Sequence, residues 1–168
     1  MPPFAEYLPQ AHGVPLSGIH VRQASAADTA VTAALAAERE GDELARCRHH
    51  QMLRLEDRDH RLFVAEAAGD VRGYGWISYL QPVRCGGHGA PDGWYLSGLV
   101  IASSFRRQGL GRQLTQARIA WVLERAEQAY YVVSASNAAS LRLHESLGMV
   151  AVTRDFAVPG VVFSHGDG

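Results

Sequence analysis

The most informative motif of this chain is RRQGLG, residues Arg106–Gly111. It follows an apolar, strand-like segment, Trp94–Ile101, and precedes an amphipathic helix pattern. Gly109 and Gly111 let the backbone approach a ligand closely, and a helix beginning there offers unpaired N–H groups and the positive end of its dipole. Three cations flank the turn: Arg106, Arg107 and Arg112. The placement predicts a site for a polyphosphate-bearing ligand.

The glycine pattern differs from the two commonest phosphate loops, because no GK[ST] follows it and the first glycine of GxGxxG is missing. It resembles the GNAT superfamily of acetyl-CoA-dependent N-acyltransferases, whose signature [RQ]xxGx[GA] lies between the fourth strand and the third helix. A second block, NAASLRLHESLGM, resembles the NxxSxxLYxxxGF stretch of the same family. The matching positions of the two blocks are Arg106, Gly109, Gly111, Asn137, Ser140, Leu143, Leu147 and Gly148. The resemblance covers roughly residues 19–164.

The resemblance implies direct transfer, in which an amine attacks an acyl thioester held in a splay between the motif strand and the next, parallel strand. Backbone groups of Leu99 and Ile101 would pair with the pantetheine arm, and N–H groups from Gln108 to Arg112 would hold the pyrophosphate. Asn137 would contact the cofactor, cap its own helix, or do both. The full set of cofactor-binding residues implied is Leu99, Val100, Ile101, Arg106, Arg107, Gln108, Gly109, Leu110, Gly111, Arg112, Asn137 and Ser140.

The catalytic candidate is His144, which stands where the family usually has a tyrosine that acts as general acid. An imidazole titrates near neutrality, so His144 could protonate the sulfur of CoA; the alternative is a histidine that only lines the groove. A base is harder to find, because Trp94–Ile101 contains no carboxylate or histidine, and Tyr95 is the residue nearest the usual position. Glu66, His60, a water relay or an already neutral amine remain open.

Composition indicates one ordinary globular domain: 168 residues, 47% hydrophobic, 20% charged, with a formal net charge of −1. That charge gives no general field for nucleic acid, and no apolar run is long enough to span a membrane. Cys47 and Cys85 form no metal-binding or disulfide pattern, so we expect no metal and a cytoplasmic location. Residues 1–18 read as an N-terminal arm and residues 19–168 as a single GNAT-like domain.

The expected fold class is α+β, a mixed central sheet flanked by helices, with the GNAT-like acyl-CoA N-acyltransferase fold. Ser25 and Asp28 form a capping-box-like helix start, Ala68–Asp70 a hairpin turn, and Leu44, Cys47 and Met52 the inner face of the second helix. The predicted strands are 19–23, 61–67, 71–80, 94–101, 130–134, 149–158 and 161–164. The predicted helices are 25–37, 42–55, 109–126 and 137–147, and Leu110, Leu114, Ala117 and Trp121 share one face of the third.

The predicted activity is transfer of an acetyl group from acetyl-CoA to a primary amine of a small molecule, with a peptide or protein N-terminus as the near alternative. A polycationic acceptor of the aminoglycoside kind would need acidic lining. Carboxylates that could supply it are Glu56, Asp57, Asp59 and Asp92. Trp94, Ser97 and Tyr131 line the acceptor cavity or belong to the core. A non-catalytic acyl-CoA sensor is the alternative from another class, and a homodimer formed through the C-terminal strands is left open.

Overall fold

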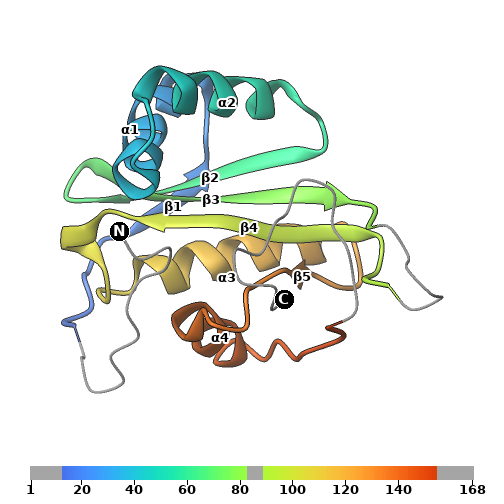
Figure 1. Cartoon of the computed structure of the whole chain (residues 1–168). Helices are drawn as coiled ribbons and strands as arrows, with labels where there is room; N and C mark the ends of the chain where they lie inside the picture. The colour runs from blue at the N-terminus through green and yellow to red at the C-terminus, as the bar shows by residue number, and fades with distance from the viewer. Residues whose placement is uncertain (1–12, 83–88, 155–168) are drawn as a thin grey trace.

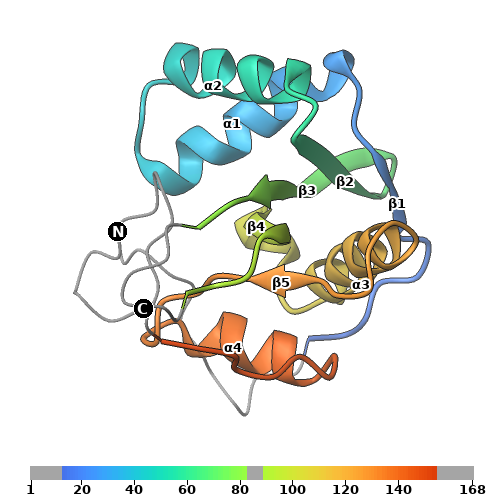
Figure 2. The same ribbon diagram turned by 90° about the vertical axis from the view of Figure 1, so that its right-hand side faces the viewer.

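A five-stranded sheet in the order β1-β2-β3-β4-β5 forms the middle layer of the molecule (Figures 1 and 2). The computed structural model describes residues 13–82 and 89–154. The strands are β1 (His20–Gln23), β2 (His60–Ala67), β3 (Asp70–Leu80), β4 (Gly93–Ile101) and β5 (Tyr130–Tyr131). The first four are antiparallel, and β5 pairs with β4 in parallel. The predicted mixed sheet is confirmed.

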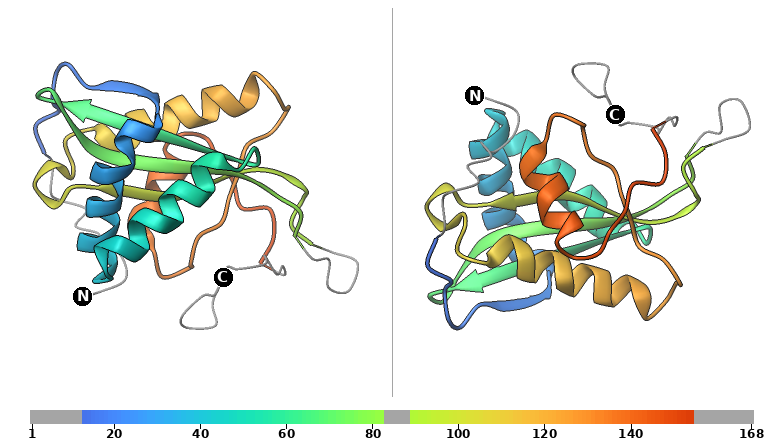
Figure 3. Two further views of the ribbon diagram at one scale, coloured as in Figure 1. Left: turned by 90° about the horizontal axis from the view of Figure 1, so that it is seen from above. Right: turned by 90° about the horizontal axis from the view of Figure 1, so that it is seen from below.

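Four helices cover the two faces of the sheet, two on each side (Figures 1 and 3). One face carries α1 (Thr29–Glu40) and α2 (Leu44–Glu56), and the other carries α3 (Leu110–Leu123) and α4 (Ala138–Glu145). Two short 3₁₀ turns, η1 (Ala26–Asp28) and η2 (Ser103–Phe105), precede α1 and the motif loop. Two buried clusters result, one between α1, α2 and the sheet and one between α3 and the sheet.

The entry into α1 is fixed by the capping box expected from the sequence. The Ser25 N–H donates to Asp28 Oδ2 at 2.8 Å, and Arg22 on β1 donates to both oxygens of the same carboxylate. Gly41 ends α1 with a left-handed φ of 68°, which a glycine adopts without steric cost. Two strong local signals therefore bound the helix, and both are readable from the sequence.

The β2–β3 hairpin is also confirmed. Ala68 and Gly69 have φ values of 53° and 84°, the positive pair that a tight two-residue hairpin loop requires. On α3, Leu110 and Leu114 are fully buried, and Trp121 packs against the same cluster, as the periodicity predicts. Strand β3 of the hairpin pairs with one edge of β4, and α3 packs against one of its faces.

Three element predictions need correction. On α2, the predicted inner face is confirmed for Cys47, which is buried, but it is wrong for Leu44 and Met52, which are 52% and 46% exposed. The strand predicted over 130–134 pairs only at Tyr130–Tyr131, since β5 then leaves β4. The strand predicted over 149–158 is not formed in its described part, residues 149–154. Its remainder and the last predicted strand, which a homodimer would have used, lie outside the described residues.

The described part of the N-terminal arm lies against the motif loop. The Leu16 N–H donates to the Gln108 carbonyl at 3.0 Å, and a side chain at Gly13 would collide with the backbone of Arg107. Within residues 13–82 and 89–154, no helix is both long and apolar enough to cross a membrane.

Candidate active site

The strands β4 and β5 part in the middle of the molecule. They pair only at Tyr95 with Tyr130 and at Leu96 with Tyr131, after which β5 ends while β4 continues to Ile101 (Figure 2). The second half of β4 therefore has an edge that no described part of β5 covers. Backbone N–H and C=O groups on such an edge are available to an extended ligand.

A bulge in β4 lies at the point where the strands part. Tyr74 pairs with Val100 but Trp76 pairs with Ser97, so β4 carries an extra residue there. Gly98 has a φ of 54°, and a Cβ atom on it would stand 3.1 Å from Trp76 Cδ1. Gly98 was not predicted as a site residue, although a lone glycine inside a strand pattern often marks a bulge.

The motif loop turns sharply between η2 and α3. Arg107 and Gly109 both have left-handed backbones, with φ values of 62° and 96°. The loop therefore brings successive N–H groups toward one side, and the first turn of α3 adds the N–H groups that every helix leaves without an internal partner. A Cβ on Gly111 would lie 3.8 Å from the Leu99 and Ile101 side chains, so this turn sits directly on the end of β4.

The flanking arginines have partners close to the loop. Arg106 Nε donates to the Ile101 carbonyl at 3.3 Å, and Arg112 Nη1 donates to Ser146 Oγ at 2.9 Å. Both side chains are exposed, so they can exchange these neutral acceptors for a charged one. Of the predicted residues Arg106–Arg112, all but the buried Leu110 keep some exposure beside the end of β4.

The side chains of Leu99 and Ile101 pack against the α3 cluster, while Val100 is buried on the opposite face. The Leu99 carbonyl accepts a hydrogen bond of 2.9 Å from Arg39 Nη1. Together with the Arg106 bond to Ile101, this means that arginines reach both carbonyls where the sequence predicts pantetheine pairing. A ligand there would share or displace those donors.

Asn137 caps α4, the alternative that the sequence analysis had left open beside cofactor contact. Its Oδ1 accepts from the Ser140 N–H at 3.1 Å. The cap fixes the start of the helix that carries His144, and Ser140 lies one turn before that histidine.

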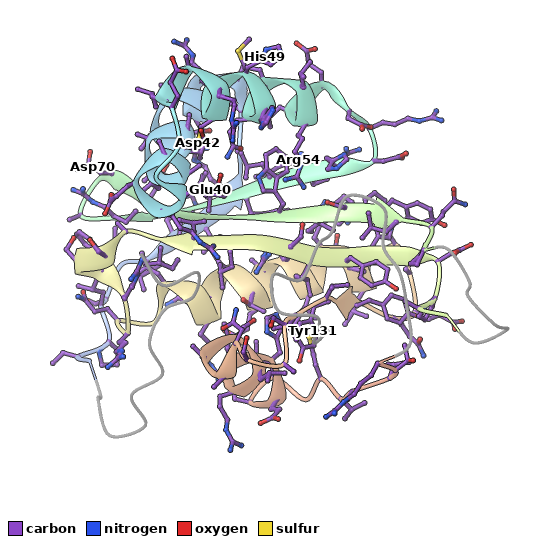
Figure 4. All side chains as sticks on the ribbon, in the orientation of Figure 1. Glu40, Asp42, His49, Arg54, Asp70 and Tyr131 are labelled. Atoms are coloured by element: carbon purple, nitrogen blue, oxygen red, sulfur yellow. The ribbon has the colours of Figure 1, made fainter. Side chains whose placement is uncertain are left out.

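His144 is 4% exposed and lies under the parting strands. Its ring stacks on Tyr131 of β5 at 3.9 Å between centroids with an angle of 6° (Tyr131 is labelled in Figure 4). Nδ1 donates to the Ser140 carbonyl at 2.8 Å, whereas buried Nε2 has no partner among the described residues. Burial, together with the charge of Arg118, lowers the pKa of His144 despite its bond to Ser140. A neutral ring that donates through Nδ1 presents Nε2 as a proton acceptor.

Arg118 is a buried cation that the sequence analysis missed. It is 1% exposed and donates to the carbonyls of Trp76 and Ser97 at 3.0 and 3.1 Å, which flank the β4 bulge. Burial lowers its pKa to about 9, and no described carboxylate pairs with it. Gly75 makes room for it, because a Cβ there would lie 2.7 Å from Cζ. The i, i+4 spacing from Leu114 was the available signal.

A cavity of about 790 Å³ lies between α1, α2 and the sheet, on the face of β4 opposite α3. Its volume is typical of small-molecule sites. The described residues that line it are Ala36, Arg39, Glu40, Gly41, Cys47, His50, Gln51, Leu53, Arg54, Tyr74, Trp76, Gly98 and Val100. Because Gly98 is also the bulge residue, the cavity meets the β4 edge at the point where the strands part.

Several predicted acceptor-site residues do not line this cavity. The four carboxylates of Glu56, Asp57, Asp59 and Asp92 are absent from its described lining, so the suggested acidic convergence is not formed. The candidate base Glu66 lies at the β1–β2 edge, bonded to Arg22 and His20. The other candidate base, His60, hydrogen-bonds to Asp57. It is not among the described lining residues, but its ring packs in a T-shaped arrangement with Trp76, which lines the cavity.

The aromatic residues at the start of β4 belong to the core. Trp94 packs edge-on against Trp121 and Tyr79, and the Tyr95 hydroxyl donates to the Pro91 carbonyl at 2.6 Å. Burial raises the pKa of Tyr95 to about 12, which makes it a poor base. Ser97 Oγ lies 3.3 Å from Ser78 Oγ, beneath the cavity.

Glu40, Asp42 and Cys47 lie together where α1 joins α2. Asp42 pairs with Arg46, and burial raises the pKa of the Cys47 thiol, so this thiol stays protonated at neutral pH. A protonated thiol is a weak metal ligand. We assign no metal to the group.

The family model of the acetyltransferase (GNAT) family matches residues 28–149. The aminoglycoside N-acetyltransferase AAC(6')-Iy in complex with CoA superposes with a TM-score of 0.69 at 20% identity, over 94% of this chain and 97% of that one. A ribosomal-protein-alanine N-acetyltransferase from Brucella melitensis gives 0.61 at 29% identity, over 77% and 83%. A transcriptional regulator from Bacillus halodurans gives 0.64 at 20% identity, over 80% and 95%.

No curated protein sequence matches the chain. The family match nevertheless spans most of the chain, and it includes the motif loop, the bulged strand and the helix that carries His144. The chain therefore belongs to the acetyltransferase (GNAT) family and is an acyltransferase that uses acetyl-CoA as its donor.

Proposed function

We propose that the protein transfers the acetyl group of acetyl-CoA to a primary amine of a small molecule, by direct attack within a ternary complex. The observation that carries this proposal is the position of Gly98. It lies in the bulge beside the uncovered edge of β4 and also lines the cavity on the other face. A donor on the edge and an acceptor in the cavity would therefore meet at one residue.

The residues around the uncovered edge suit acetyl-CoA. Backbone groups of Leu99, Val100 and Ile101 would run beside the pantetheine arm, and the motif loop from Arg106 to Arg112 would hold the pyrophosphate with N–H groups and guanidinium cations. Asn137 and Ser140 at the start of α4 would also contact the donor, because this helix carries His144, which stacks on Tyr131 of β5. The buried Nε2 of His144 has no described partner, and in the neutral ring it would accept a hydrogen bond from the N–H of the attacking amine.

His144 would move the proton that the reaction releases. As the N–C bond forms and the C–S bond breaks, the attacking nitrogen loses a proton and the sulfur needs one. Neutral His144 would accept the proton on Nε2 and return it to sulfur, while Nδ1 stays bonded to the Ser140 carbonyl. The same atom, Nε2 of His144, would thus act first as the base and then as the general acid that the sequence suggested.

Calorimetry of acetyl-CoA combined with a thiol-release assay on an amine panel tests the proposal. We expect binding and amine-dependent release of CoA. Binding of acetyl-CoA without release of CoA to any amine would instead support a non-catalytic sensor. No binding of acetyl-CoA would contradict the proposed donor site. Release only with peptides would support the second candidate, an N-terminal acetyltransferase, which the 29% identity to the Brucella melitensis structure favours.

A further inference from the structure

Two charged groups of the proposed acceptor cavity, Arg54 and Glu40, lie apart from each other (Figure 4). Figure 4 shows Arg54 between α2 and the sheet, and Glu40 near the junction of α1 and α2. Glu40 is the only carboxylate among the described lining residues, whereas Arg39 and Arg54 are cations. Arg39 already donates to the Leu99 carbonyl. Arg54 is therefore the cation best placed to meet an acceptor.

Arg54 is held in place by contacts that leave its charge unneutralised. Its Cζ stands 4.3 Å from the centroid of the Trp76 ring, and Nη2 donates to Ser78 Oγ at 3.0 Å. No described carboxylate lies within ion-pair distance of it, Asp57 acting only at longer range. A guanidinium has five N–H donors in a planar fork that suits a carboxylate, and only one of the donors of Arg54 has a hydrogen-bond partner among the described residues.

Burial lowers the pKa of Arg54, but an arginine keeps its proton at neutral pH. A desolvated cation without an anion is costly, and an incoming carboxylate would relieve that cost. Gln51, one turn earlier on α2, offers a second group. Its buried Oε1 has no described partner, so it can accept an N–H from a ligand.

Two side chains, Ser78 and Ser97, lie between Arg54 and the bulge of β4. Ser78, which accepts from Arg54, lies 3.3 Å from Ser97 across the β3–β4 pair, and Ser97 precedes the bulge residue Gly98. A small molecule with its carboxylate on Arg54 can therefore place an amine toward the bulge from within the same cavity. A polycation would instead meet two arginines and one carboxylate.

We propose that the acceptor is an amino carboxylate, a small primary amine whose carboxylate is held by the Arg54 guanidinium. The proposal rests on the proposed transferase function. The predicted acceptor therefore carries an anionic group that Arg54 binds, in contrast to the aminoglycosides for which the N-acetyltransferase AAC(6')-Iy is named.

The test compares matched acceptors: free L-amino acids and short ω-amino acids, their carboxamides, and the corresponding decarboxylated amines, with an aminoglycoside and a polyamine alongside. Thiol release gives kcat and KM for each. We expect the acids to exceed their amides in kcat/KM by about 10- to 100-fold, the range for a charge-assisted bond. Arg54→Gln should remove most of that ratio by raising KM for the acids, while acetyl-CoA affinity stays unchanged.

Arg54→Lys keeps the charge and should restore part of the ratio, and thermal unfolding of each variant shows whether it is folded. Arg48→Gln, which removes an exposed arginine from the same helix, is the matched control and should leave the ratio intact. Binding of N-acetylated amino acids in the presence of CoA, followed by calorimetry, gives a readout besides turnover and should weaken in Arg54→Gln.

Equal use of acids and amides, or preference for the polycations, would overturn the carboxylate anchor while leaving the transferase intact. Equal loss for acids and amides in Arg54→Gln would also overturn it. If acetyl-CoA binds but no acceptor of any class releases CoA, the transferase proposal fails, and the inference about its acceptor falls with it.

Discussion

The two faces of β4 are built by different means. On the α3 side, the proposed donor surface consists mainly of backbone: the uncovered strand edge, the left-handed turns at Arg107 and Gly109, and the first turn of α3. On the α1–α2 side, the proposed acceptor cavity is lined by side chains such as Arg54, Gln51 and Trp76. A ligand common to a whole family can be read by backbone, whereas an acceptor that varies needs side chains that can change.

This difference is also why the α3 side of β4 has a recognisable sequence motif and the α1–α2 side does not. Backbone groups require particular φ values, and only glycine adopts several of them cheaply, so the donor face leaves a glycine pattern in the sequence. Side chains on a helix can supply a cation from many positions. The residues that line the cavity therefore have no fixed spacing in the sequence.

The largest effect should come from substitution of His144, the residue proposed to move the proton beside the donor surface. His144→Ala should lower kcat by about 10²- to 10⁴-fold, the usual contribution of general acid–base catalysis, with acetyl-CoA affinity little changed. Because the pKa of His144 is lowered, its active neutral form is lost only below the usual histidine value of 6.5, so wild-type kcat/KM should fall there as pH decreases.

Pre-steady-state thiol release across pH measures this, with exposed His49→Ala as the control. A variant that retains kcat within a few-fold, or an acid limb that survives the substitution, would reduce His144 to a packing residue.

The second prediction concerns Arg118, whose hydrogen bonds at the β4 bulge should stabilise both faces of this strand. Arg118→Met leaves the Trp76 and Ser97 carbonyls without their donor, so we expect the free energy of unfolding to fall by about 2 to 4 kcal/mol. Urea titration measures the change. Arg125→Met, which removes an exposed arginine near the end of α3, should change it by less than about 0.5 kcal/mol. Similar stabilities for the two variants would mean that the bulge does not depend on Arg118.

Gly109 should break the donor face alone. Gly109→Glu forces a non-glycine residue into a φ of 96° and places a carboxylate at the start of α3, so acetyl-CoA affinity should fall by about 100-fold. Gly69→Glu is the matched control, because it has a similar φ of 84° in the β2–β3 turn and no atom near its added Cβ. Calorimetry should separate the two variants; equal losses of affinity would point to general destabilisation.

The smallest effect concerns the support of the acceptor face at the start of α1. Arg22 holds the pKa of Asp28 down to about 2, so ionised Asp28 stabilises the fold above its unfolded value of about 3.8, and this stabilisation is lost as pH falls toward 2. Asp28→Asn should lower stability at pH 7 by about 1 kcal/mol, since Arg22 is partly exposed.

The difference between wild type and Asp28→Asn should narrow in urea titrations between pH 4 and pH 2. Asp70→Asn disrupts an exposed pair with Arg72 and should have little effect at any pH. A constant difference across this range would show that the Asp28 charge does not stabilise α1.

The parts of the fold that the sequence predicts are those with strong local signals. The capping box at Ser25 and Asp28, the turn at Ala68 and Gly69 and the start of α3 at Gly109 each depend on a few adjacent residues. The inner face of α2 was predicted wrongly in part, because its buried side includes Gln51 and the part-buried Arg54, and periodicity of apolar residues cannot detect polar side chains that face a cavity.

From the sequence alone it was possible to predict the mixed α+β class, the order of elements up to α4 and the glycine turn before α3, because backbone conformation depends strongly on neighbouring residues. Contacts within the folded chain were needed to find that Gly98 connects the β4 edge with the cavity, that Arg118 supports the bulge from α3, and that Nε2 of His144 has no described partner. Each of these depends on burial and on contacts between residues far apart in the chain. Burial also sets which atoms of a histidine or arginine are free to react, and no local pattern contains that information.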